Sequence, residues 1–126
     1  METSIYEQAG GEEGINKLAS AFYRRVLADP IMLPLFERPD DDHVGRMALF
    51  LGEEFGGPAE HTRQRGGDAT MARIHVGLNI SNRQRDRWIE HMRAAMEEVH
   101  MPALFIQFFE PKMQYFASLA QKDSWS

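Results

Sequence analysis

Apolar residues recur along this chain at the spacing of α-helices rather than in the alternation typical of β-strands. Ser81 and Gln84 stand at the spacing of a capping box, which marks the start of one helix. The triplet Gly56-Gly57-Pro58 is typical of a helix end. Four stretches carry the apolar pattern and predict helices over residues 12–28, 40–55, 81–99 and 103–121.

Two stretches interrupt this pattern. Pro111 lies inside the helix predicted over residues 103–121 and predicts a kink or a broken start to that helix. Residues 58–70 are polar, contain glycine and arginine, and predict a long loop of the kind that usually has a function. With no alternating stretch elsewhere, the sequence predicts an all-α fold of about five or six helices. We expect a single domain over residues 1–126.

Charge and composition narrow the classes of function. The chain has 14 Lys and Arg against 19 Asp and Glu, a formal net charge of −5. This balance argues against nucleic acid as a partner, because phosphate binding needs a clustered basic face. The lack of cysteine excludes disulfides, thiolate metal sites and iron–sulfur clusters. No apolar run approaches the roughly 18 residues of a membrane span, and METSIYEQAGGEEG is unlike a secretory leader, so we expect a cytoplasmic protein.

Three of the five histidines stand among polar residues. His91 and His100 alternate with Arg and Glu and are expected at the surface. His61 lies in the predicted loop, where it could meet a ligand carboxylate, although a solvated loop histidine is the better expectation. These three positions therefore carry little functional signal on their own.

His75 stands in the apolar stretch MARIHVGL, just before Gly77. On a short helix, a neutral imidazole nitrogen aimed into an apolar slot is what a single-ligand iron site needs. The alternative is a half-buried histidine that bonds a backbone carbonyl, and for this segment taken alone that alternative is favoured.

Three more residues combine a polar atom with an apolar setting. His43 begins a predicted helix, with Met47 and Phe50 following on its face, so it is either a gate over a ligand or a helix-start histidine. Tyr23 and Trp88 are each either packed in the core or placed to donate a hydrogen bond to a bound small molecule. Taken separately, simple packing explains each of these two.

Three segments together resemble the truncated haemoglobins. They are IYEQAGGEEGINKLASAFYRRVLADPIMLPLF, the GGP triplet, and RIHVGLNISNRQRDRWIEHM. The resemblance runs in order from about Ile5 to Val99 and so covers most of the chain. The GGP triplet and the Arg-Asp-Arg-Trp context are most similar to the second group of that family.

The resemblance implies a shortened globin, with two antiparallel helix pairs stacked over a non-covalently held haem b (iron protoporphyrin IX). His75 matches the proximal ligand of the iron, and Tyr23 and Trp88 match distal donors to a bound ligand. His43 falls above the iron, with Met47 one turn later. The resemblance and the apolar stripes give the expected haem contacts Phe22, Phe36, Phe50, Met71, Leu78, Ile80 and Met92.

Three positions depart from the pattern of the second group. His43 stands where a small residue is frequent, and Phe36 stands where tyrosine or histidine is common. Ile74, before the proximal histidine, is not the basic residue often found there. The haem carboxylates must therefore meet other cations, for which Arg46, Arg63, Arg65 and Arg73 are the candidates, with His61 as a further partner.

The expected function is binding of dioxygen, carbon monoxide or nitric oxide, in a monomer or homodimer. Nitric oxide dioxygenase-like or peroxidase-like turnover would need an external reductase, because the chain has no flavin or nicotinamide motif. The competing hypothesis is a haem-free helical module of globin-like fold with a regulatory or interaction role.

Overall fold

A computed structural model describes residues 4–36 and 42–125, with the side chains of residues 68, 69, 71 and 72 outside the described part. These residues form helices and no strand, so the predicted all-α class is confirmed. The helices outnumber the five or six expected, because short ones occur between the long ones. They are α1 (Ile5–Gln8), α2 (Gly11–Leu27), the 3-10 helix η1 (Leu33–Phe36), α3 (His43–Glu54), α4 (Glu60–Arg65), α5 (Asp68–His75), α6 (Asn82–Glu98) and α7 (Ala103–Ser124).

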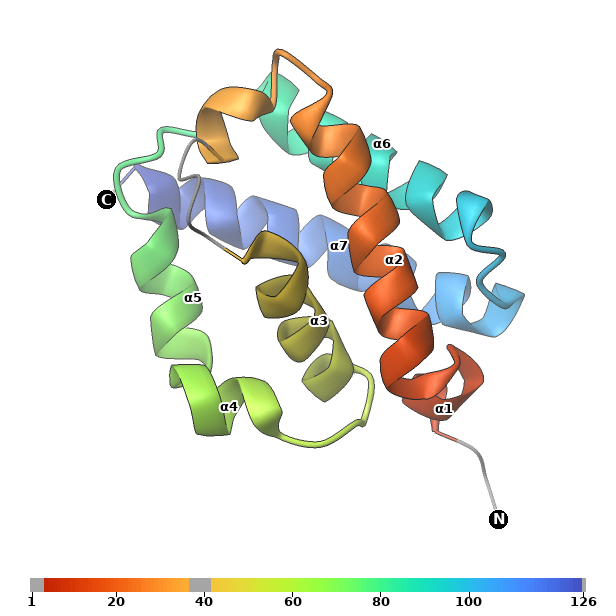
Figure 1. The fold of residues 1–126 in the computed structure, drawn as a ribbon. Helices are drawn as coiled ribbons and strands as arrows, with labels where there is room; N and C mark the ends of the chain where they lie inside the picture. Colours follow the sequence, from red (N-terminus) through yellow and green to blue (C-terminus); the bar gives the residue numbers. More distant parts are fainter. Residues whose placement is uncertain (1–3, 37–41, 126) are drawn as a thin grey trace.

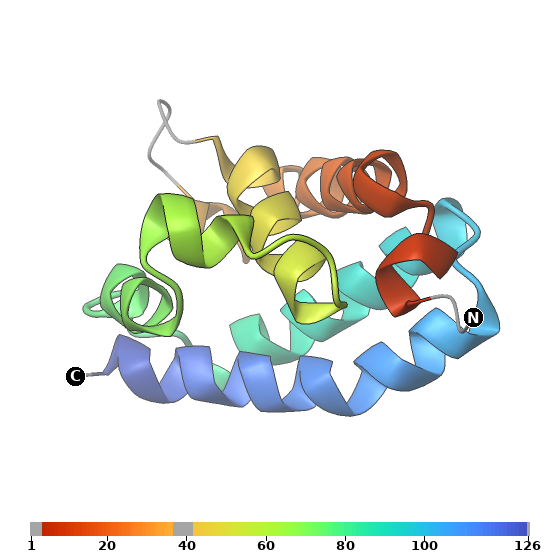
Figure 2. The same ribbon diagram turned by 90° about the horizontal axis from the view of Figure 1, so that it is seen from below.

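The four long helices stack as two antiparallel pairs (Figures 1 and 2). Helices α2 and α3 form one pair, and α6 and α7 form the other. The pairs meet mainly where α2 crosses α6, and α5 lies against the end of α7. Within the described residues, none of the helices combines the length and apolarity needed to span a bilayer.

Local capping residues mark the starts of α6 and α3. Ser81 and Gln84 form the predicted capping box at the start of α6. Asp42 caps α3 by accepting a hydrogen bond from the Gly45 amide at 2.8 Å. The helix predicted over residues 40–55 thus begins at His43, and Asp40 and Asp41 lie outside the described residues.

The turn after α3 requires glycine. Gly56 has φ +92°, a left-handed conformation that strains other residues. A Cβ atom on Gly57 would lie 2.6 Å from Cδ1 of Tyr6. The Tyr6 amide donates to the Phe55 carbonyl at 2.8 Å, so this turn also fixes α1 to the end of α3.

Helix α7 runs through Pro111 without a break, so the predicted broken start is wrong. Proline leaves one helix carbonyl without its usual partner. Pro111 is exposed, and water can reach that side of the helix. The loss of one internal hydrogen bond is therefore tolerated.

The two halves of helix α7 face different parts of the interior. Its first half carries Phe105 and Phe109, which are fully buried against Phe55 with ring centroids 4.6 and 5.0 Å away. Its second half carries Phe116 and Ala117, which line a cavity instead. The core thus fills one end of the molecule and leaves a hollow at the other.

Candidate functional site

A cavity of about 940 Å³ lies between the helix pairs, next to the part of α7 against which α5 packs. Its walls come from the end of α2, η1, α3, α4, α5, the start of α6 and the second half of α7. The residues lining it include Tyr23, Phe36, His43, Met47, Phe50, His61, His75, Leu78, Ile80 and Trp88. Residues from distant parts of the chain are thereby brought to one apolar space.

Tyr23, Phe36 and His43 form an aromatic cluster on one wall. The rings of Tyr23 and His43 are stacked with centroids 5.4 Å apart. Phe36 meets both edge-on, at 5.5 Å from Tyr23 and 5.3 Å from His43. The buried Nε2 atom of His43 has no hydrogen-bond partner among the described residues. This wall therefore presents an unsatisfied polar atom beside apolar rings.

Burial raises the pKa of Tyr23 above its usual value, and the nearby charge of Arg46 opposes only part of that rise. The phenol is therefore neutral at neutral pH. A neutral phenol keeps its proton and can donate a hydrogen bond.

Trp88 lines the cavity from α6 and is half-buried. Its ring meets Phe22 edge-on at 5.4 Å. Phe22 and Met92 are fully buried and are not among the described residues that line the cavity. Direct contact of these two with a ligand therefore stays a prediction; the structure places Phe22 in the core, directly behind the cavity residues Tyr23 and Trp88.

His75 is the last residue of α5 and lines the cavity in a half-buried position. Gly77 follows with φ +83°, so the chain turns sharply after the histidine. Leu78 and Ile80 then return to the cavity wall. The side chain of Met71 lies outside the described residues.

His61 is buried, with 2% of its surface exposed, so the expectation of a solvated loop histidine is wrong. Most of the predicted loop 58–70 is helical, in α4 and the start of α5. Glu53 accepts hydrogen bonds from the Thr62 amide at 2.9 Å and its hydroxyl at 2.6 Å, and this anchors α4 to α3. Both ring nitrogens of His61 have no partner within the described part of the chain, and its ring meets Phe50 edge-on at 5.6 Å.

His91 was also expected at the surface, and that prediction is wrong. Its Nε2 lies 2.7 Å from Oδ2 of the buried Asp29, which also accepts from Nε of Arg87 at 2.6 Å. Burial by itself would raise the pKa of Asp29, but hydrogen bonds from Arg87, His91 and the Ile31 amide hold it well below its usual value. His100 is exposed, as expected.

The structure separates the four candidate arginines. Arg46 and Arg65 line the cavity. Arg63 is largely exposed and pairs with Glu60, and Arg73 donates to the Thr70 hydroxyl at 3.1 Å. Neither of these two is among the described residues lining the cavity, so Arg46 and Arg65 are the better placed of the four candidates. Sequence reasoning missed Arg85 and Lys112, which also line it but stand in helices without a motif.

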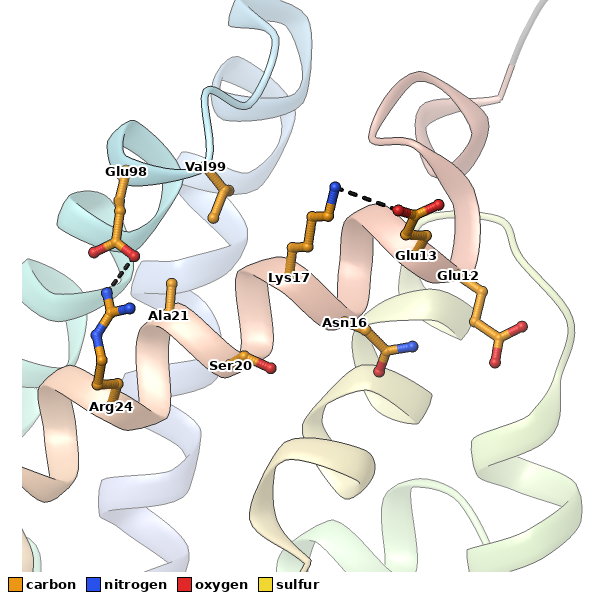
Figure 3. A pocket seen from close by; sticks show the side chains of 9 residues that line it. All are labelled: Glu12, Glu13, Asn16, Lys17, Ser20, Ala21, Arg24, Glu98 and Val99. Atoms are coloured by element: carbon orange, nitrogen blue, oxygen red, sulfur yellow. Dashed lines mark hydrogen bonds and ion pairs between the residues drawn. The ribbon is translucent and has the colours of Figure 1, made fainter.

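A second hollow lies on the outer face of α2, near the end of α6 (Figure 3). Four of its charged groups pair with one another, Lys17 with Glu13 and Arg24 with Glu98. It contains no histidine among its described lining residues. The cavity that holds His75 is therefore the stronger functional candidate.

Residues 4–122 match a family model for bacterial-like globins. The group 2 truncated hemoglobin YjbI of Bacillus subtilis is 29% identical over 110 residues, which are 87% of this chain and 83% of that protein. The chain belongs to the truncated haemoglobin family. Its relatives include the second group, as the sequence predicts.

Solved structures agree with this globin over more than nine tenths of its length. The haemoglobin of the thermophilic phototrophic bacterium Chloroflexus aurantiacus is 36% identical, with a TM-score of 0.84 over 99% of this chain and all of the other. The truncated oxygen-avid haemoglobin of Bacillus subtilis is 29% identical, with a TM-score of 0.82 over 92% of this chain and 97% of the other. The predicted stack of two helix pairs is confirmed.

The cavity of this globin fits the haem that the family implies. A haem is a flat apolar disc with two carboxylates at one edge and an iron at its centre. The cavity offers apolar walls, the cations Arg46 and Arg65, and His75. It also holds buried nitrogens of His43 and His61 that have no partner among the residues the structure describes, and such atoms are costly to bury unless a ligand supplies polar atoms.

Proposed function

We propose that this globin holds haem b in the cavity, with His75 as the single protein ligand of the iron, and binds diatomic gases there. The observation that carries the proposal is that His75 shares one cavity with Tyr23, His43 and Trp88. The chain has no cysteine, so haem cannot be attached through cysteine thioethers. The diatomic gases that we expect to bind are dioxygen, carbon monoxide and nitric oxide.

When bound, the haem would supply an iron that can coordinate both a protein nitrogen and a gas molecule. His75 is suited to supply that nitrogen because imidazole is the nitrogen donor that proteins most often offer to metals. Its place at the end of α5 brings the half-buried imidazole to the cavity wall together with the apolar Leu78 and Ile80.

Three side chains can donate hydrogen bonds to the gas ligand. Tyr23 keeps its phenol proton, and Trp88 has an indole N–H that can only donate. His43 is the third. Its ring brings a nitrogen to the wall it shares with Phe36, whose own side chain has no polar atom and cannot donate. A hydrogen bond to a charged or polarised group contributes about 1.5–3 kcal/mol. Two such bonds would slow ligand escape by roughly a hundredfold or more.

The carboxylates of haem need positive or donating partners at the cavity edge. Arg46 and Arg65 line the cavity from α3 and α4, so they are the arginines we assign to that role. His61 lies in the same part of the wall and its two nitrogens have no partner in the described chain. We assign it the same role, because a carboxylate would satisfy an otherwise unpaired buried imidazole.

Haem titration of the purified protein tests the proposal. Haemin should produce the absorption spectrum of a histidine-ligated haem protein, and His75→Gly should lose it. Free imidazole should restore the spectrum of His75→Gly by filling the space of the missing ring. His100→Gly makes the same change at an exposed site and should bind haem normally. An unchanged spectrum in His75→Gly would contradict the ligand assignment. A folded wild type that binds no haemin would favour the haem-free module.

Gas binding to ferrous haem consumes no electrons once the iron has been reduced. Repeated nitric oxide dioxygenase-like or peroxidase-like turnover would need a separate reductase. Loss of nitric oxide with matching nitrate formation beyond one equivalent per haem, dependent on an added reductase, would establish turnover beyond binding.

A further inference from the structure

The chain segment that follows His75 is held by the last turn of α7. The amides of Gly77 and Asn79 both donate to the Ser124 carbonyl at 3.1 Å. The Ile80 amide donates to the Ser124 hydroxyl at 2.9 Å. Three of the first amides after the proximal position thus depend on one residue of α7.

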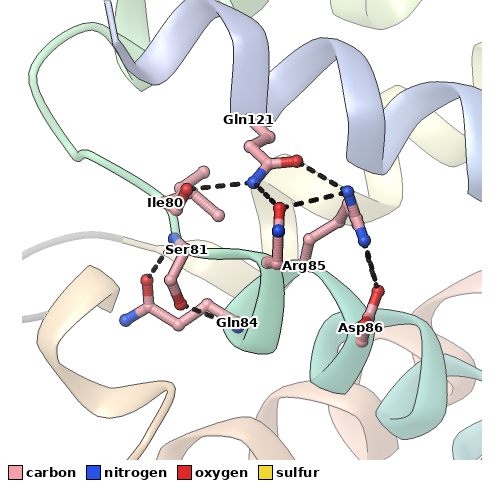
Figure 4. Close-up of polar contacts among 7 residues, drawn as sticks. Ile80, Ser81, Gln84, Arg85, Asp86 and Gln121 are labelled. Carbon is pink, nitrogen blue, oxygen red and sulfur yellow. Dashed lines mark hydrogen bonds and ion pairs between the residues drawn. The ribbon is translucent and has the colours of Figure 1, made fainter.

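Side chains on either side of Ser124 hold the same segment. Trp125 donates from Nε1 to the Ile80 carbonyl at 3.0 Å, and Gln121 donates from Nε2 to that carbonyl at 3.3 Å. Figure 4 shows the Gln121 side chain between the Ile80 carbonyl and Arg85. We refer to Gln121, Ser124 and Trp125 together as the α7 latch.

The held segment has a backbone that needs such support. Gly77 has φ +83° and Asn79 has φ +51°, both in the left-handed region. A non-glycine residue in that region costs free energy and persists only where its surroundings fix it. The surrounding bonds to the α7 latch supply that constraint.

Ser124 is fully buried, and its hydroxyl is used in both directions. It accepts from the Ile80 amide and donates to the Gln121 carbonyl at 2.6 Å. Removing the hydroxyl would therefore leave a buried amide and a carbonyl without these partners, which is costly. Trp125, in contrast, is 62% exposed, so its ring adds little to the core.

The held segment reaches the cavity on both sides of its turn. Leu78 and Ile80 line the cavity beside His75. His75 ends α5, a helix of only eight residues, so its backbone is fixed by α5 on one side and by residues 76–80 on the other. We propose that the α7 latch positions His75, so that the end of α7 controls how the proximal imidazole meets the iron. This inference rests on the proposed role of His75 as iron ligand.

Amide hydrogen exchange in the haem-free protein tests whether the α7 latch holds the segment that follows His75. Ser124→Ala should speed exchange of the Gly77, Asn79 and Ile80 amides, with the largest change at Ile80, by roughly tenfold for one lost buried hydrogen bond. Ser118→Ala is the matched control, because Ser118 is exposed on the same helix. Ser124→Cys has similar size and a weak donor, so it should restore part of the protection.

Resonance Raman spectra of the ferrous, ligand-free holoprotein test the link to His75. The iron–histidine stretching band should shift and broaden in Ser124→Ala and shift less in Trp125→Phe, which removes the indole N–H together with part of a largely exposed ring. Ser118→Ala should leave the band unchanged. Ser124→Cys should move it back toward the wild-type position.

The two measurements separate two kinds of failure. Equal exchange rates in Ser124→Ala and Ser118→Ala would overturn the latch. Faster exchange at residues 77–80 with an unmoved iron–histidine band would overturn its control of His75. A wild type without any such band would instead contradict the proposed function, and would also remove the role of the latch at the iron.

Discussion

The imidazole of His43 lies nearly parallel to the phenol ring of Tyr23, with centroids 5.4 Å apart and planes inclined by 22°. Phe36 closes the group by meeting both rings edge-on. Two side chains with polar atoms are thus packed together on one wall of the cavity, rather than spread around it. The packing fixes both rings, so a ligand in the cavity meets donors that need little reordering.

Tyr23→Phe should speed dissociation of dioxygen from the loaded protein by roughly tenfold to a hundredfold, because one hydrogen bond to a polarised ligand is lost. His43→Ala should leave haem binding intact and speed dissociation by the same amount or less. Rapid-mixing measurements of the dissociation rate check both. Tyr6→Phe is the control, since Tyr6 lies against the Gly57 turn away from the cavity.

Other results for these two variants would change the role that we assign to His43. If Tyr23→Phe alone changes the rate, His43 is only a helix-start histidine whose ring fills space. If His43→Ala changes the ferric spectrum from six- to five-coordinate, His43 binds the iron directly rather than acting as a donor.

His61→Phe should have opposite effects on the haem-free and haem-loaded forms. Without haem, the change removes two buried nitrogens that lack partners in the described chain, so it should raise the free energy of unfolding by roughly 1–3 kcal/mol. With haem, it removes a partner for a carboxylate and should speed haem loss. Urea unfolding of the haem-free form and haem transfer to a scavenger protein measure the two effects. Slower haem loss from the variant would contradict the carboxylate role.

The sequence predicted what depends on local pattern. The four long helices follow from apolar spacing, and the capping box at Ser81 places the start of α6 within a residue. The resemblance placed His75, Tyr23, His43 and Trp88 at one site, and all four line the cavity. Their chemical roles stay predictions.

What the sequence missed depends on partners far along the chain. The polar stretch 58–70 indicates a loop, yet Glu53 anchors Thr62 and His61 is buried. His91 stands among charged residues, but its partner Asp29 is 62 residues away and no local spacing reveals it. Burial of a polar side chain is decided by tertiary contacts, so periodicity alone underestimates it.

Arg65→Ala should speed haem loss roughly tenfold, since a charge-assisted hydrogen bond is removed. Arg63→Ala is a closely matched control, because both residues lie in the last turn of α4 and Arg63 pairs with Glu60 at the surface. The effect of Arg65→Ala should shrink at high salt if it is electrostatic. Equal rates of haem loss in the two variants would remove Arg65 from the carboxylate site.

Asp29→Asn should destabilise the protein by roughly 1.5–3 kcal/mol at pH 7, because the buried carboxylate accepts charge-assisted bonds from Arg87 and His91. The folded pKa of Asp29 lies well below its unfolded value of about 3.9. Its stabilising contribution is therefore present above the unfolded pKa and is lost as the pH falls through the folded one.

The difference in unfolding free energy between wild type and Asp29→Asn should accordingly be constant from pH 7 to about 5 and narrow below about pH 4. Urea unfolding at a series of pH values measures it. Asp86→Asn is the control: Asp86 is exposed and pairs with Arg85 at the surface, where such pairs contribute about 0–1 kcal/mol. A gap for Asp29→Asn that stays constant down to the lowest pH at which the protein folds would show that shape and packing at Asp29, rather than its charge, hold the loop before η1 against α6.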